Sequence, residues 1–148
     1  MENTPFRILL ADDDEVDRLL FKEALAEIEI VSIVHTVNNG IQLMEYLSEM
    51  KDNLPQLIFL DLNMPRKSGL ECLKEIRVNE EFNSIPVAIY STSASENDIE
   101  ETFLNGANIY IKKPNDFSVL KQLLAKAVSS AHLYLEPSFN IDIFLLRI

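Results

Sequence analysis

Five short apolar segments alternate with five segments of helical periodicity along this chain, and this alternation limits the possible folds more than any other feature. The apolar segments are four to six residues long, a length typical of buried strands rather than helices. Strands that alternate with helices favour one parallel sheet with helices packed on both of its faces. We therefore expect strands over 6–11, 30–35, 57–60, 87–90 and 108–112, with helices over 15–28, 41–50, 70–78, 96–105 and 117–128.

Composition narrows the class of protein. The chain has 148 residues, of which 47% are hydrophobic and 25% charged, so it can build one globular domain. No apolar stretch is long enough to span a bilayer, and the acidic N-terminus does not resemble a secretory signal. Cys72 is the only cysteine, so no intramolecular disulfide can form, and we expect a cytoplasmic protein. The net charge of −11 disfavours partners such as nucleic acid or an anionic membrane.

The predicted strands end in residues that suit phosphate and metal chemistry. Acids follow the first and third strands, a hydroxyl follows the fourth and an ammonium the fifth: Asp12–Asp14, Asp61, Ser91 and Lys113. Right-handed crossovers bring the carboxyl ends of parallel strands to the same side of the sheet. Clustered carboxylates repel one another unless a cation holds them, and a few hard oxygen ligands favour Mg²⁺. Asp61 can then serve as a metal ligand, as a nucleophile toward phosphorus, or as both.

Each of these groups has a simpler explanation when it is taken alone. An acidic triplet can begin a helix, where the helix dipole favours negative charge. A lysine followed by proline can belong to an ordinary loop, and serine and threonine commonly cap helices. The presence of all these groups at the ends of four strands of one predicted sheet favours a site for phosphoryl transfer over the simpler explanations.

Four segments of the sequence resemble, in order and spacing, the receiver domain of two-component response regulators. The segments are LLADDD, LIFLDLNMPRKSGLECLKEIR, IPVAIYSTS and GANIYIKKP, and the resemblance spans residues 6–130. It implies an α/β fold of the flavodoxin-like (βα)5 type, with a doubly wound, five-stranded parallel sheet. It also implies a bacterial phosphoprotein with Mg²⁺ as its cofactor.

The resemblance assigns roles to individual residues. Asp61 matches the family's phospho-acceptor, and Lys113 matches the lysine that binds a phosphoryl oxygen. Ser91 matches the switch hydroxyl, and Tyr110 the switch aromatic that packs inward on activation. The implied metal ligands are Asp13 directly, Asp12 through a metal-bound water, Asp61, and the backbone carbonyl of Asn63.

Partners also follow from the resemblance. The phosphoryl donor is expected to be a sensor histidine kinase or a phosphotransfer protein, and the output a change in contacts with a downstream protein target. Self-phosphorylation from a phosphodonor and autodephosphorylation are expected, but not turnover of a separate substrate. The chain is also similar to phytochrome-associated regulators, which implies a homodimer through the face of the fourth helix, fifth strand and fifth helix.

The C-terminal part of the sequence has a pattern of its own. We expect a receiver domain over 1–131 and an apolar extension over 132–148 without a separate effector domain. Apolar and polar residues alternate over much of 139–146, which predicts a strand. An exposed apolar strand tends to aggregate, so this segment is expected to pack on its own domain or to pair with a second subunit.

Two other functions remain open from the sequence alone. A phosphohydrolase of the haloacid dehalogenase type also uses a strand-end aspartate, but it requires a second aspartate two residues later, where this chain has Asn63. A phosphorylation-independent adaptor would keep the fold and lose the acceptor, the acidic pair or the lysine. None of these three features is lost in the sequence.

Overall fold

The computed structural model describes residues 4–131 and 144–147. Within these ranges, five strands alternate with five helices along the chain, as the sequence pattern predicts. The strands are β1 (Phe6–Ala11), β2 (Ser32–Val37), β3 (Leu57–Leu60), β4 (Val87–Ser91) and β5 (Ile109–Lys112). The helices are α1 (Glu15–Glu27), α2 (Gly40–Glu49), α3 (Gly69–Val78), α4 (Glu96–Leu104) and α5 (Phe117–Ser129).

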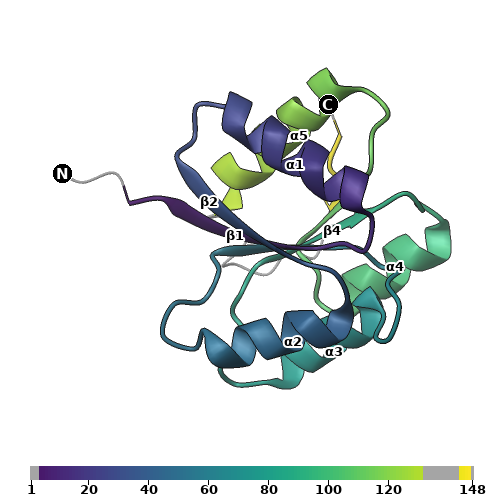
Figure 1. Cartoon of the computed structure of the whole chain (residues 1–148). Helices are drawn as coiled ribbons and strands as arrows, with labels where there is room; N and C mark the ends of the chain where they lie inside the picture. Colours follow the sequence, from purple (N-terminus) through teal and green to yellow (C-terminus); the bar gives the residue numbers. More distant parts are fainter. Residues whose placement is uncertain (1–3, 132–143, 148) are drawn as a thin grey trace.

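The five strands form one parallel sheet in the order β2-β1-β3-β4-β5. Helices α1 and α5 cover one face of the sheet, and α2, α3 and α4 cover the other (Figure 1). This is the doubly wound, flavodoxin-like fold of receiver domains that the resemblance implies. The chain leaves β1 toward one side of the sheet and later returns to β3 on the other side. The carboxyl ends of β1 and β3 therefore flank the topological switch point, where such folds bind their ligands.

The sheet is buried between two apolar layers. All residues of β3 and β4 are buried, which explains why both strands are continuous apolar runs rather than alternating ones. Successive side chains of β3 enter opposite layers: Ile58 packs in the cluster under α2 and α3, while Phe59 packs in the cluster under α1 and α5. Phe21 of α1 contacts Phe59 edge-on, with 4.9 Å between the ring centroids. Packing in the two layers fixes the position of each strand in the sheet, and with it the position of the residues that follow the strand.

Side-chain caps fix where several helices begin. Ser95 caps α4 and Asp116 caps α5, because the side chain of each accepts a hydrogen bond from a backbone N–H in the first turn. The Ser95 cap does not form a reciprocal capping box, since the Asp98 carboxylate accepts a hydrogen bond from the Ser93 hydroxyl. The reciprocal arrangement is found at the start of α3 instead, between Ser68 and Glu71.

The second strand begins two residues later than the sequence pattern suggests. The prediction over 30–35 was wrong at its ends, because Phe6 of β1 pairs with Ser32 and the ladder continues to Val37. Ile30 precedes the strand and packs partly buried against the layer under α1 and α5. Its apolar character therefore reflects packing against that layer rather than membership of the strand.

The C-terminal prediction lies mostly outside the described residues, which omit 132–143 and 148. Of the strand predicted over 139–146, the described part makes one parallel bridge between Leu145 and Tyr110. The division into a domain over 1–131 and an extension over 132–148 stays a prediction. Among the described helices, none is both long and apolar enough to cross a membrane.

Candidate functional site

Three carboxylates meet at the carboxyl edge of the sheet. Ala11 pairs with Leu60 in the ladder of β1 and β3, so Asp12 and Asp61 follow at the same level on neighbouring strands. One carboxylate oxygen from each of Asp12, Asp13 and Asp61 lies within 4.8 Å of the other two. Asp12 and Asp61 are buried, whereas Asp13 is exposed. The predicted acidic cluster is therefore brought together by the register of two adjacent strands.

Lys113 places an ammonium among these acids. Its Nζ lies 2.8 Å from Asp12 Oδ2, 2.8 Å from Asp17 Oδ2 and 3.3 Å from Asp61 Oδ2. The Lys113 backbone N–H donates to the carbonyl oxygen of Ser91, which holds the end of β5 against β4. Burial by itself lowers the pKa of the ammonium, but the contacts with Asp12 and Asp17 outweigh this effect and raise the pKa above its ordinary value. Lys113 is therefore a fixed positive charge at every physiological pH.

The charge balance at Asp12 is different. Burial raises the pKa of this carboxyl to about 6, although the Lys113 ammonium opposes the shift. Removing a carboxylate from water costs free energy, and one shared ammonium compensates this cost only in part. A divalent cation beside Asp12, Asp13 and Asp61 would supply the missing positive charge. Three oxygen ligands within a few ångströms fit a hard ion such as Mg²⁺.

The loop that carries Asp61 is held tightly against α3. Asp61 Oδ1 accepts a hydrogen bond of 3.2 Å from the Asn63 backbone N–H. The Gly69 backbone N–H donates to the Leu62 carbonyl at 3.0 Å. A Cβ at Gly69 would lie 2.1 Å from the Asp61 carbonyl oxygen, so only glycine allows α3 to start this close to Asp61. The backbone of Asp61 is therefore located by a helix start as well as by the sheet.

Ser91 and Tyr110 lie along the next two strands. Ser91 is fully buried at the end of β4, and its Oγ accepts a hydrogen bond of 3.2 Å from the Ser93 backbone N–H. The Tyr110 hydroxyl donates to the Ser93 carbonyl at 2.6 Å, and the Tyr110 side chain is also fully buried. Burial, reinforced by the charge of Asp98, raises the pKa of Tyr110 to about 12. Tyr110 thus points inward and touches the loop that follows β4.

The two interpretations of the acidic triplet apply to different residues. Asp12 and Asp13 join the carboxylate cluster, whereas Asp14 caps α1 by accepting from the Asp17 backbone N–H. The structure describes the Asn63 N–H contact with Asp61, and the proposed role of the Asn63 carbonyl stays a prediction. Sequence reasoning missed Asp17, whose carboxylate contacts Lys113. Its place three residues after the cap was the available signal, but that place also suits a simple interaction with the helix dipole.

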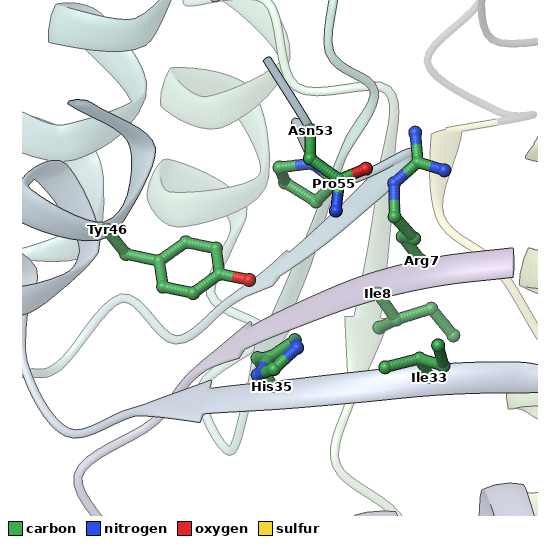
Figure 2. A pocket seen from close by; sticks show the side chains of 7 residues that line it. All are labelled: Arg7, Ile8, Ile33, His35, Tyr46, Asn53 and Pro55. Carbon is green, nitrogen blue, oxygen red and sulfur yellow. The ribbon is translucent and has the colours of Figure 1, made fainter. Parts of the chain in front are cut away.

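A small hollow lies at the opposite end of β1, away from the acidic cluster. Its volume is about 60 Å³, and its lining consists of Arg7, Ile8, Ile33, His35, Tyr46, Asn53 and Pro55. The Tyr46 and His35 ring centroids lie 5.6 Å apart, and in Figure 2 the Arg7 guanidinium extends away from both rings. Arg7 Nε donates to the Leu54 carbonyl at 3.0 Å, so this arginine already serves to hold the loop before β3. The carboxyl edge is thus the better candidate for chemistry.

Comparison with known proteins shows the family of this chain. The family model of the response regulator receiver domain matches residues 8–125. The chain is 31% identical to FilR2, a probable methanogenesis regulatory protein of Methanothrix harundinacea, over 80% of this chain and 78% of that protein. It is 32% identical to the response regulator Rcp1 of Synechocystis, over 82% of this chain and 86% of that protein.

Solved structures give the same result. The phosphorylated cyanobacterial phytochrome response regulator RcpA is 36% identical, with a TM-score of 0.78 over 88% of this chain and 95% of that one. The Mn²⁺-bound form of Rcp1 is 31% identical, with a TM-score of 0.74 over 90% and 97% of the two chains. Since the family model covers most of the sequence and the relatives match over most of their own length, this chain belongs to the response regulator receiver domains of two-component signalling.

Proposed function

We propose that this receiver domain is a phosphorylation switch in which Asp61 accepts a phosphoryl group while Mg²⁺ is bound beside it. The observation that carries the proposal is the meeting of three carboxylates and one ammonium at the carboxyl ends of β1, β3 and β5. Receiver domains interact with histidine kinases and with downstream targets. The donor is therefore a phosphohistidine on a kinase or phosphotransfer protein, and the output is a changed set of protein contacts.

The metal would be held by Asp12, Asp13 and Asp61, together with the backbone carbonyl of Asn63. The burial of Asp12 supports this assignment, because burial raises the pKa of this carboxyl and the Lys113 ammonium opposes the shift only in part. The relative Rcp1 has been crystallised in a Mn²⁺-bound form. When bound, Mg²⁺ would neutralise part of the negative charge on the phosphoryl oxygens.

The chemistry needs few protein groups. One carboxylate oxygen of Asp61 attacks phosphorus, the bond between phosphorus and the histidine nitrogen breaks, and an acyl phosphate forms. The Lys113 ammonium, now 3.3 Å from Asp61 Oδ2, is placed to bind an oxygen of the new phosphoryl group. The Ser91 hydroxyl can donate a hydrogen bond to another oxygen. Attack of water on phosphorus later releases phosphate and restores the carboxylate.

The donor protein must reach this edge of the sheet, and α1 begins there. Three large apolar side chains of α1 are exposed: Val16 by 62%, Leu19 by 54% and Leu20 by 39%. We propose that they form the apolar part of the donor's contact surface. Leu19→Ser is then expected to slow transfer from a phosphorylated kinase while leaving the rate with acetyl phosphate unchanged. An equal loss with both donors would contradict this assignment.

The alternative functions are less well supported. The family assignment and Asn63 both argue against a haloacid dehalogenase type of phosphohydrolase. A phosphorylation-independent adaptor would have no need for Lys113, which is 8% exposed and contacts three acids. Autophosphorylation separates this adaptor from the switch.

Intact-mass spectrometry tests the proposal. Wild-type protein incubated with acetyl phosphate and Mg²⁺ is expected to gain one acid-stable, base-labile phosphoryl group, and Asp61→Asn is expected to gain none. Asp52→Asn is the matched control, because Asp52 is an exposed aspartate in the loop before β3, whereas Asp61 follows the other end of that strand. An adduct of equal yield on Asp61→Asn, or no adduct on the wild type, would contradict the proposed function.

A further inference from the structure

The C-terminal residues 144–147 run along the outer edge of β5 and beside α5, where they are yellow in Figure 1. Leu145 forms a parallel bridge with Tyr110, and the Leu146 backbone N–H donates to the Tyr110 carbonyl at 2.9 Å. The Arg147 carbonyl accepts a hydrogen bond of 2.9 Å from Lys126 Nζ of α5. The segment thus uses backbone groups that an edge strand otherwise leaves unpaired.

An aromatic side chain anchors the segment. Phe144 is only 1% exposed, and its ring centroid lies 5.3 Å from that of Phe103 and 6.0 Å from that of Tyr110. Both contacts are edge-on, the favoured geometry for aromatic pairs. Leu145 packs against the same apolar layer, whereas Leu146 packs against the layer under α1 and α5. The segment therefore packs against both apolar layers of the core at this edge of the sheet.

The Phe144 ring is connected to the proposed switch hydroxyl, Ser91, through Tyr110 and Ser93. Phe144 contacts the Tyr110 ring, the Tyr110 hydroxyl donates to the Ser93 carbonyl, and the Ser93 N–H donates to Ser91 Oγ. With Phe144 docked, an outward movement of the Tyr110 ring would meet the Phe144 ring. The docked segment thus favours the inward position of Tyr110.

We infer that the outer edge of β5, with Phe103 and Tyr110, is a strand-accepting groove that residues 144–147 of the same chain occupy, and that occupancy of this groove and phosphorylation of Asp61 favour one another. The second half rests on the proposed function and on the role that the resemblance implies for Tyr110, a switch aromatic that packs inward on activation. Because coupling between two sites is reciprocal, docking strengthens phosphoryl binding by the same factor by which phosphoryl binding strengthens docking.

Hydrogen exchange on the full chain tests the docking. The Leu146 amide is expected to be protected in the wild type and to exchange faster in Phe144→Ala, which removes the anchor ring. Arg147→Ala is the matched control in the same segment, because the Arg147 side chain is exposed and its contact with Lys126 uses the backbone carbonyl. Protection equal in Phe144→Ala and in the wild type would overturn the docking.

Calorimetric titration with beryllium trifluoride in Mg²⁺, as a phosphoryl mimic, tests the coupling. Phe144→Ala is expected to bind the mimic about fivefold more weakly than the wild type and Arg147→Ala, within the usual range of such couplings. The mimic is also expected to slow exchange of the Leu146 amide in the wild type by the same factor. Equal affinities in all three proteins would overturn the coupling.

The two conclusions fail in different ways. A wild type that does not bind the mimic overturns both the proposed function and the coupling, whereas the exchange of the Leu146 amide without the mimic still tests the docking.

Light scattering shows whether the docked segment belongs to the same chain or to a second copy. A monomeric wild type with a protected Leu146 amide supports docking within one chain. A dimer that Phe144→Ala converts to a monomer overturns it in favour of exchange between two copies.

Discussion

Two clusters of side chains near β5 are organised in opposite ways. The acidic pocket consists of Asp12, Asp13, Asp61 and Lys113, and it crowds charges at the end of the sheet. The aromatic cluster consists of Phe103, Tyr110 and Phe144, and it buries rings at the side of the sheet. The first cluster places charged groups where burial costs stability, and the second gains stability from burial.

Substitutions in the acidic pocket and in the aromatic cluster therefore have different physical consequences. In the acidic pocket, the loss of one charge leaves its opposite partners uncompensated. In the aromatic cluster, the loss of a ring removes packing but leaves no buried charge behind. Substitutions in the two clusters are therefore expected to differ in size, in their dependence on pH and in their response to Mg²⁺.

The largest effect is expected for Lys113→Met in metal-free buffer. It leaves two buried carboxylates, Asp12 and Asp61, without their ammonium, and we expect the free energy of unfolding in urea to fall by about 3–5 kcal/mol. Saturating Mg²⁺ is expected to restore part of the loss, because it binds the folded acids. Lys121→Met is the control, since Lys121 forms a more exposed pair with Glu27 at 3.2 Å. Surface ion pairs contribute about 1 kcal/mol or less to stability. Equal losses of unfolding free energy in Lys113→Met and Lys121→Met would therefore contradict the expected cost of leaving buried carboxylates without their ammonium.

The next effect concerns pH in metal-free buffer. Asp12 has a folded-state pKa of about 6 against an ordinary value of 3.8, so between these values the folded protein keeps a proton that the unfolded chain has released. Stability contributed by Asp12 is therefore present at low pH and is lost as the pH rises toward 6, by about 2–3 kcal/mol in total.

Asp12→Asn is expected to remove this fall, while Asp52→Asn keeps it. The measurement is the free energy of unfolding at a series of pH values from 4 to 8. The same pH dependence in wild type and Asp12→Asn would show that burial of Asp12 does not shift its titration. The aromatic cluster has no group that titrates in this range, so Phe144→Ala should shift the whole curve without changing its shape.

The smallest expected effect is the loss of stability in Phe144→Ala. Leu145 makes an isolated bridge outside the five-stranded sheet, so we expect Phe144→Ala to cost only the docking free energy of the segment, about 1–2 kcal/mol. The same variant is expected to lower the pKa of Tyr110 from about 12 toward its ordinary value of 10.0, as followed by tyrosinate absorbance. Phe117→Ala, a half-buried aromatic of α5, is the control and should leave this titration in place. An unchanged Tyr110 pKa in Phe144→Ala would contradict the contact.

The sequence predicted the acidic pocket better than it predicted the aromatic cluster, and the reason is physical. Asp61 follows a continuous apolar run, and parallel strands place their ends together, so a local pattern was enough to locate the acids. The start of β2 was misplaced because Ile30 is apolar for a different reason, its packing beside α1. Asp17 was missed because a first-turn acid has the same pattern whether or not it meets a lysine from a distant strand.

The aromatic cluster could not be derived from any local pattern. Phe103, Tyr110 and Phe144 belong to three separate segments, and only the folded chain shows that their rings meet. The sequence predicted a strand near the C-terminus and left its partner undecided. The structure gives β5 as the partner of Leu145.

Gly69 has a consequence for anyone who wishes to transplant this site into a designed scaffold. The start of α3 approaches Asp61 so closely that a single methyl group on Gly69 would meet the Asp61 carbonyl oxygen at 2.1 Å. A graft that copies the acids and the lysine but places alanine at this position would push Asp61 away from the other charged groups. A transplanted site therefore needs glycine at the start of the helix as well as the charged side chains.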